Sequence, residues 1–276
     1  MEKLKHFLKT TAAGRILLIP YRFWFGAHYV IPTFKQLLHW TFTSREIDNF
    51  TYDLTALNRQ YLIAFVATVT HQPVGDVQRY IDEIVHDQAL HDHIVRFTQQ
   101  APERYIADST AKYSRRIGWY AFVRAMKPKI VVETGTNKGL GSCIIAAALK
   151  RNAHDGAPGY LYTTDIDPVA GYLLQLPYSE YAKILYGDSI ASLNTLSQTI
   201  DLFINDSDHS QEYELREYET VQAKLSPRAI ILGDNVHCSS KLWEFSQRTK
   251  RAFLFFQEQP LHHWYAGAGI GVSYHL

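Results

Sequence analysis

Short apolar runs recur through the second half of the chain, and each run ends in a cluster of polar residues or glycine. Runs that are apolar on both faces are typical of buried parallel strands, and the segments between them are long enough to form crossover helices. The five runs cover residues 129–132, 160–164, 182–186, 200–204 and 229–232. The pattern therefore predicts an α/β fold built on a mostly parallel sheet.

The first half of the chain shows a helical pattern instead. Apolar residues spaced three and four apart predict one helix capped by Thr55, a second opened by Pro73 and a third around residues 90–97. Residues 113–126 predict a further helix that leads into the first strand. The stretch 101–110 is the best candidate boundary, so we predict a helical extension over residues 1–110 and a sheet domain over residues 111–276.

A glycine-rich turn follows the first predicted strand, over residues 133–142, and a helical segment begins at residue 143. Gly135 and Gly139 allow the chain to turn tightly, and the helix N-terminus offers bare backbone amides to a ligand. Glu133, in the first position of the turn, would repel a phosphate but accept hydrogen bonds from an amine. The turn therefore favours a ligand with a cationic amino-acid end over a dinucleotide.

This turn resembles motif I of the class I S-adenosylmethionine-dependent methyltransferases, and the later strand ends arrive in the order of that superfamily. The resemblance runs from about Ser114 to the C-terminus. It implies a Rossmann-like, mostly parallel seven-stranded sheet, in which residues 251–256 and 269–274 form an antiparallel hairpin at the edge. It also implies that S-adenosyl-L-methionine is the cofactor and that the turn contacts it through Glu133, Gly135, Thr136, Gly139 and Ser142.

The ends of the second and third predicted strands complete the implied cofactor site. A carboxylate at the end of the second strand can accept both hydroxyls of a ribose, and the resemblance places Asp165 there. The alternative is that Asp165 only caps a turn. The turn after the third strand borders the adenine in this superfamily, so Asp188 and Ser189 are candidates to bind its amino group. Ser189 also suits the cap of a helix over residues 190–196, and the two roles are compatible.

Polar clusters follow the fourth and fifth predicted strands, at residues 205–210 and 233–237. Carboxyl ends of neighbouring parallel strands converge on one crevice, where Asp206, Asp234 and Asn235 would offer three oxygen ligands to Mg²⁺. The arrangement resembles the metal-dependent small-molecule O-methyltransferases, such as the catechol and macrolide-sugar enzymes, and also the broad family 24 methyltransferases. The resemblance adds Asp206 to the cofactor contacts. The alternative is that these acids cap helices or pair with Arg and Lys.

His209 stands three residues after Asp206, where the metal-dependent enzymes carry a basic residue. A chelated hydroxyl has a lowered pKa, and an imidazole can accept its proton near neutral pH before the oxygen attacks the sulfonium methyl group. The alternative is that His209 packs under the substrate or binds its hydroxyl. The sequence thus predicts O-methylation of a small molecule or sugar, with His209 and Asp206 as catalytic residues. The competing hypothesis is a Rossmann-like nucleotide-binding protein, either without catalysis or acting as an NAD-dependent oxidoreductase.

Composition limits the classes of binding partner and the cellular compartment that we expect. The net charge of +1 gives no general case for nucleic acid, and residues 205–208 differ from the Asn/Asp-Pro-Pro-aromatic pattern of enzymes that methylate base amino groups. Cys143 and Cys238 form no recognisable disulfide or metal pattern, so we expect a reducing cytoplasm. The first residues lack the pattern of a cleavable signal.

Charge is divided unevenly along the chain. Residues 1–45 hold seven Lys or Arg and one acid, a balance of +6, which leaves −5 for the remainder. Pro20, Arg22 and Pro32 interrupt the apolar stretch there, which makes it too broken for a transmembrane helix. Aromatic residues mixed with cations suit peripheral contact with the inner membrane surface through residues 1–40. They equally suit packing on the sheet domain or across a homo-oligomer, which is the commoner role of such patches.

Overall fold

The computed structural model describes residues 2–234 and 236–276, and its chain divides into two compact units. The first contains the described residues through Ser44 together with His262–Tyr265. The second contains Arg45–Leu261 and Ala266–Leu276. This division differs from the predicted boundary near residue 110, because the helices that follow residue 55 belong to the same compact unit as the sheet.

The first unit consists of three helices, α1 (Glu2–Thr10), α2 (Ala12–Leu17) and α3 (Ile19–Thr43). The sequence led us to expect that proline would interrupt this region, but α3 is continuous for 25 residues. Pro20 lies in its first turn, where a missing N–H costs nothing, and Pro32 lies inside the helix. Trp40 contacts Trp264, with ring centroids 5.3 Å apart. Among the described residues, none of the helices has the length and apolar character needed to cross a membrane.

The second unit begins with the helices predicted from the first half of the chain. They are α4 (Ala56–Thr70), α5 (Val74–Val85), α6 (Gln88–Gln100), the short η1 (Pro102–Tyr105) and α7 (Arg116–Met126). The predicted starts are confirmed at Thr55, whose hydroxyl accepts the Asn58 N–H, and at Pro73, which immediately precedes α5. Helix α7 starts three residues later than predicted, because Ser114 adopts a left-handed backbone conformation with φ of 50°.

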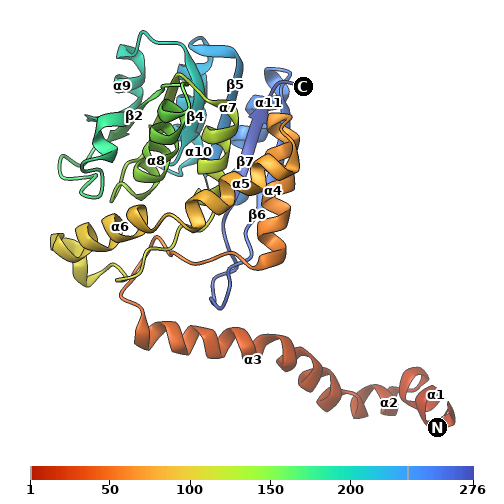
Figure 1. The fold of residues 1–276 in the computed structure, drawn as a ribbon. Coiled ribbons are helices and arrows are strands. Elements are labelled where there is room, and N and C mark those ends of the chain that lie inside the picture. Colours follow the sequence, from red (N-terminus) through yellow and green to blue (C-terminus); the bar gives the residue numbers. More distant parts are fainter. Residues whose placement is uncertain (1, 235) are drawn as a thin grey trace. The chain divides into compact units, whose positions relative to one another are not determined.

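The predicted seven-stranded sheet is confirmed, with strand order β3-β2-β1-β4-β5-β7-β6 (Figure 1). Its strands are β1 (Ile130–Thr134), β2 (Tyr160–Asp165), β3 (Ala182–Tyr186), β4 (Ile200–Asn205), β5 (Leu225–Asp234), β6 (Ala252–Gln257) and β7 (Gly269–Tyr274). Only β7 runs antiparallel to its neighbours, β5 and β6. Strand β5 begins at Leu225, earlier than predicted, and Pro227 lies in the irregular stretch where its register against β4 shifts.

Helices cover both faces of this sheet (Figure 1). The remaining elements are α8 (Leu140–His154), η2 (Tyr178–Tyr181), α9 (Ser189–Thr195), α10 (Gln211–Gln222), η3 (Val236–Cys238) and α11 (Lys241–Arg248). On one face, α4 and α5 pack on α7, which packs on α8. On the other, Phe203 and Ile231 of the sheet are buried with Tyr218 of α10 and Phe245 of α11. The central strands are therefore sealed from water, and their carboxyl ends form the edge that carries the polar clusters.

The strand order reverses between β1 and β4, and the segments that follow these two strands lie against each other there. The Asp206 N–H donates to the Thr134 carbonyl oxygen at 2.9 Å, which draws the loop after β4 onto the end of β1. Gly135 follows with φ of 89°, and a Cβ on it would collide with the Asp206 carbonyl oxygen. Glycine is therefore required here both by the backbone conformation and by the closeness of the two loops.

We predict that Gly135→Ala lowers the free energy of unfolding by about 3 kcal/mol or more, because the substitution adds backbone strain to a collision with another backbone segment. Urea unfolding followed by circular dichroism measures the loss. Gly75→Ala is the matched control, since Gly75 lies in α5 with open space around its Cβ position, and it should stabilise the protein by up to about 1 kcal/mol. Equal free energies of unfolding for Gly135→Ala and Gly75→Ala would contradict the requirement for glycine at position 135.

Candidate cofactor and catalytic site

Two cavities meet where the loops after β1 and β4 lie against each other. One has a volume of about 390 Å³ and the other about 420 Å³, and both are lined by Gly135, Asn137, Asp206 and Ser207. The smaller cavity extends towards Glu133 and towards segments 46–51 and 107–112. The larger extends along the ends of β2 and β3. An elongated ligand could therefore pass over the switch point of the sheet, where open α/β folds bind their ligands.

Asp165 lies at the end of β2 in the larger cavity, at the position predicted for the ribose-binding acid. Its two oxygens accept N–H groups from Asn137 at 2.6 Å and Asp167 at 2.9 Å. These bonds fix the carboxylate against the glycine turn and leave each oxygen a further lone pair. The observed turn contacts and a ribose-binding role are therefore compatible.

Asp188 lines the same cavity and caps α9, since its carboxylate accepts the Ala191 N–H at 2.8 Å. This bond, together with one from the Tyr213 hydroxyl at 2.8 Å, holds the pKa of Asp188 below its usual value. The sequence suggested Ser189 as the cap, but Ser189 is the first residue inside the helix. The Ser189 hydroxyl is buried and donates to Glu217 of α10.

Glu217 is a residue that the sequence analysis missed. It is fully buried under the carboxyl edge of the sheet, and burial raises its pKa to about 7. Besides Ser189, its carboxylate accepts hydrogen bonds from three side chains: Thr134 at 3.1 Å, Ser207 at 2.8 Å, and Asn205. A single carboxylate thus joins the loops that follow β1, β3 and β4.

Glu133 lines the smaller cavity from the end of β1 and is almost wholly buried. It accepts hydrogen bonds from the Ser142 hydroxyl and from the Thr163 hydroxyl, the latter at 2.8 Å. Burial raises the pKa of Glu133 to about 7. Ser142, predicted as a cofactor contact, is itself fully buried, and its hydroxyl hydrogen-bonds Glu133.

The two other predicted residues of the turn occupy different places. Thr136 lines the smaller cavity, and its hydroxyl is hydrogen-bonded to that of Thr163 at 2.7 Å. Gly139 precedes α8 with φ of 90°, and a Cβ on it would lie 3.2 Å from the Cα of Gly171. Gly139 therefore shapes the turn through its backbone conformation and close packing.

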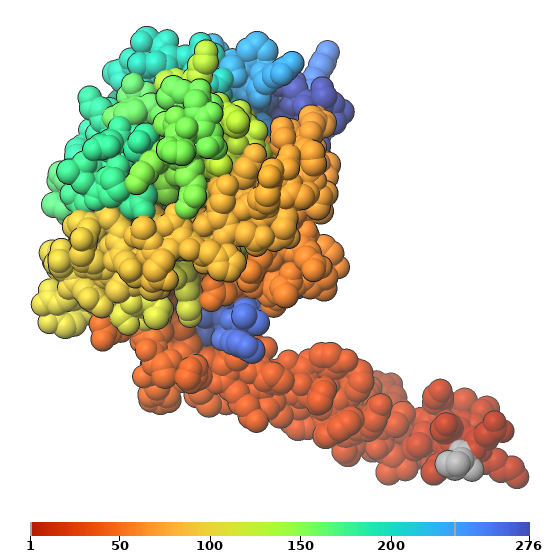
Figure 2. Space-filling model, viewed as in Figure 1, coloured from red at the N-terminus to blue at the C-terminus, as the bar shows by residue number. Residues whose placement is uncertain are grey.

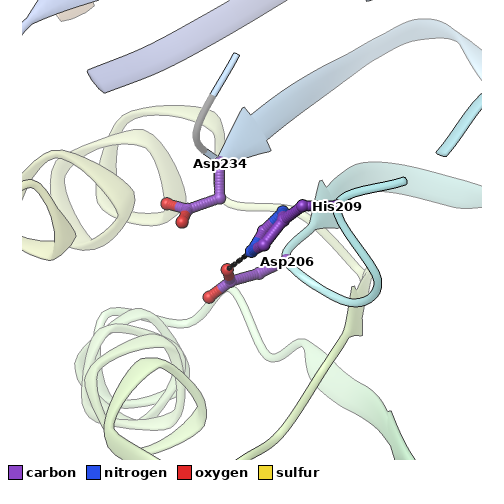
Figure 3. Close-up of side chains that lie close together, drawn as sticks. All are labelled: Asp206, His209 and Asp234. Atoms are coloured by element: carbon purple, nitrogen blue, oxygen red, sulfur yellow. Dashed lines mark ion pairs between the residues drawn. The ribbon is translucent and has the colours of Figure 1, made fainter. Parts of the chain in front are cut away.

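Asp206, His209 and Asp234 lie close together at the ends of β4 and β5 (Figure 3). One ligand atom from each of the three lies within 4.8 Å of the others, and His209 Nε2 is 3.9 Å from Asp206 Oδ1. Asp234 is fully buried, Asp206 is partly buried, and the His209 side chain is 45% exposed. Asn235, the remaining predicted ligand, lies outside the described residues.

Two arginines, also missed in the sequence, neutralise these carboxylates. The Arg115 guanidinium donates from Nε and Nη2 to the two oxygens of Asp234, and from Nη1 to Glu258 at 3.3 Å. The Arg115 backbone N–H also donates to Glu258 at 2.6 Å. Arg116 Nη2 lies 3.8 Å from Asp206. The two arginines start α7, so the helix brings positive charge to the carboxyl ends of β4 and β5.

The pKa values of the two neighbouring aspartates are shifted in opposite directions. Burial and the negative charge of Asp234 raise the pKa of Asp206 well above its usual value. Burial also disfavours the ionised form of Asp234, but the Arg115 guanidinium outweighs it and holds the pKa of Asp234 low. Asp206 is thus the carboxyl group of the pair whose ionised form a further cation would favour most.

Only one of the missed residues had a signal in the sequence. Glu258 stands two residues after the predicted strand 251–256, so the rule that ligands gather at strand ends applies to it as it does to Asp206 and Asp234. Arg115 and Glu217 lie in ordinary helical patterns, where charged residues usually face water. Their partners are distant in sequence, with Arg115 separated from Glu258 by 143 positions.

We predict that Arg115→Met lowers the free energy of unfolding by about 3–5 kcal/mol at neutral pH, because it leaves Asp234 and Glu258 buried without a cation. The low pKa of Asp234 stabilises the wild type above the unfolded-state pKa, and this stabilisation is lost as the pH falls. The gap between variant and wild type should therefore narrow in acid. Urea unfolding at neutral and acidic pH measures it.

Arg248→Met is the matched control, since Arg248 pairs with Glu219 at the exposed surface and should cost less than about 1 kcal/mol. A pH-independent loss in Arg115→Met would contradict the role of the buried charges.

The comparisons with known proteins agree with this geometry. Residues 132–236 match the family model described as a methyltransferase domain. The O-methyltransferase TomG from Streptomyces achromogenes, in complex with SAM, is 14% identical, with a TM-score of 0.51 over 66% of this chain and 89% of that one. A methyltransferase from Geobacter sulfurreducens is 18% identical, with a TM-score of 0.51 over 67% and 90%.

A comparison with curated protein sequences gives no match. The two structural likenesses show the fold, and the family model covers the glycine turn and the ends of β2 to β5. Residues 132–236 therefore match a methyltransferase domain, and the sheet that carries them has the fold of known methyltransferases.

Proposed function

We propose that the protein transfers the methyl group of S-adenosylmethionine to a hydroxyl oxygen of a small molecule or sugar. The observation that carries the proposal is the convergence of Asp206, His209 and Asp234 at the edge where the two cavities meet. A hydroxyl is a weak nucleophile until its proton is removed, so an oxygen acceptor needs a proton acceptor beside the methyl donor. TomG, which shares the fold, is an O-methyltransferase of tomaymycin synthesis.

The proposed cofactor spans both cavities. Asp165 in the larger cavity would accept the ribose hydroxyls, and Asp188 and Ser189 would border the adenine. Glu133 in the smaller cavity would bind the amino-acid end of the cofactor. A cationic amine there favours the ionised form of this buried carboxylate, whose pKa is already near neutrality. Because an unpaired Glu133 carboxylate is costly to bury, the smaller cavity favours a cofactor end that carries a positive charge.

His209 is the proposed general base. Its side chain is exposed enough to meet an incoming acceptor, and it borders the smaller cavity. Asp206 lies 3.9 Å from its ring and stabilises the imidazolium once the proton has been taken. Since the sulfonium methyl group is already activated, the remaining work of the protein is to hold the acceptor oxygen in line with it.

The donor set around Asp206 fits a divalent cation such as Mg²⁺. Two carboxylates offer the oxygen ligands that a hard cation prefers. Arg115 uses one lone pair on each Asp234 oxygen, which fixes the carboxylate as outer-sphere partners commonly do for metal ligands. Arg115 and Arg116 bring two positive charges to Asp206, Asp234 and Glu258, so one negative charge is uncompensated when all three carboxylates are ionised. Asp206 and Asp234 would hold the cation, with Asn235 as the predicted third ligand, and a bound cation would lower the pKa of the acceptor hydroxyl.

Methyl transfer from radiolabelled S-adenosylmethionine tests the proposal, with catechol and simple hexosides as hydroxyl acceptors and matched amines beside them. We expect label on the hydroxyl compounds. Asp165→Ala should weaken cofactor binding in calorimetry by roughly ten- to a hundredfold, through the loss of charge-assisted hydrogen bonds to the ribose. Asp167→Ala, two residues along the same loop, is the control and should bind as the wild type does. Label only on the amines would overturn the assignment of an oxygen acceptor.

Binding of Mn²⁺, a paramagnetic substitute for Mg²⁺, tests the cation site without an acceptor. Electron paramagnetic resonance should show free Mn²⁺ disappearing on addition of the wild-type protein. Asp206→Asn should weaken this binding by more than about a hundredfold, since even outer-sphere partners contribute ten- to a hundredfold. Asp208→Asn, in the same loop, is the control. Equal binding by both variants would remove the cation from the proposal and leave the oxygen acceptor and His209 in place.

A further inference from the structure

Helix α3 carries a continuous apolar stripe. At about 100° per residue, six of its large apolar side chains fall within roughly 140° of the helix circumference. These residues are Ile19, Phe23, Val30, Phe34, Leu38 and Phe42. All six are exposed, with Phe23 at 78% and Phe42 at 84%. Contiguous exposed apolar surface of this extent marks an interaction site.

The opposite side of α3 is polar and aromatic. Arg22, His28 and His39 lie there, with the phenol groups of Tyr21 and Tyr29 between them. Phe25 also lies on this side, and its ring meets that of Tyr29 edge to face with centroids 5.4 Å apart. Trp24 stands near the border between the two sides. Amphipathic rings at such a border are typical of side chains placed between hydrocarbon and water.

Helix α1 repeats the same division on a smaller scale. Leu4 and Phe7 are three residues apart and exposed on one side, and Lys3, Lys5 and Lys9 bring positive charge to the helix. The space-filling view shows the surface of this N-terminal segment in red to orange (Figure 2). Two successive helices thus combine apolar side chains with cations.

We infer that the segment through residue 45 docks on an anionic lipid surface, with the α3 stripe in the acyl boundary and the Lys and Arg side chains at the headgroups. The charge of this segment indicates which kind of surface binds the α3 stripe. It holds +6, whereas the rest of the chain holds −5, so an anionic surface attracts the segment and repels the remainder. A helix with one apolar face and basic residues beside it lies in the interface plane.

A second copy of the chain is the rival occupant, and the charges disfavour it. Two N-terminal segments brought together would each carry +6. Among the described residues of α1 to α3, Glu2 is the only acid available to pair with the basic side chains. A lipid surface provides the missing negative charge, and it also accepts the aromatic border that a helix-to-helix seam would leave in water.

Vesicle flotation of the full chain tests this inference, with vesicles of phosphatidylcholine alone and with added phosphatidylglycerol. The wild type should float with the anionic vesicles. Replacing Trp24 and Phe34 together by Ser should weaken binding on the order of a hundredfold, because two large side chains no longer enter the acyl boundary. Replacing Lys3, Lys5 and Lys9 together by Gln should weaken it by a similar factor, at about 1 kcal/mol for each cation.

Trp243→Ser is the matched control, since Trp243 lies in α11 and is 49% exposed, and this variant should float as the wild type does. Calorimetric binding of S-adenosylmethionine confirms that each variant is folded. Equal binding to neutral and anionic vesicles, or no loss in the lysine variant, would overturn the inference. It would also fail if no vesicle is bound and light scattering shows self-association that the Trp24 and Phe34 variant loses, since a second copy would then cover the stripe.

Discussion

Negative charge buried at the carboxyl edge of the sheet is the constraint on which the methyltransferase unit depends. An ionised carboxylate is costly in a dry interior unless something neutralises it. Asp234 and Glu258 share the guanidinium of Arg115. Glu217 and Glu133 are surrounded by hydroxyl and amide donors and have pKa values near 7. Burial and the negative charge of Asp234 raise the pKa of Asp206. The edge therefore holds these acids by three different means, and only the last leaves a place for a further cation.

The same contacts position the site. Arg115 ties the start of α7 to the end of β5, and through Glu258 to the end of β6, so the cation that neutralises the edge also joins three elements. Glu217 does the same for the loops after β1, β3 and β4. Each loop is thus held by a buried polar group, in addition to the apolar core that packs the strands beneath it. Stability and chemistry at this edge consequently depend on the same few interactions.

The sequence was sufficient wherever a signal is local. Apolar runs located the strands. The glycine turn located the switch point, because the positive φ of Gly135 favours glycine at that position. Asp165 was predictable from its position at a strand end. Arg115 was not, because its role depends on an acid 119 positions away, and no local pattern distinguishes it from a solvated helical arginine. The boundary predicted near residue 110 differs from the observed one for a similar reason. The sequence of α4 and α5 does not reveal that these helices pack on α7.

Charge also separates the two parts of the chain in function. The unit that carries the sheet gathers buried acids at its carboxyl edge, which suits the cationic cofactor proposed above. Residues 1–45 hold seven Lys or Arg and one acid, whereas residues 46–276 hold 21 Lys or Arg and 26 acids. This segregation lets one chain keep an acidic active-site edge and a basic surface at once. The net charge of +1 is therefore the sum of two opposite balances, +6 over residues 1–45 and −5 over residues 46–276, and each balance suits the role proposed for its own segment.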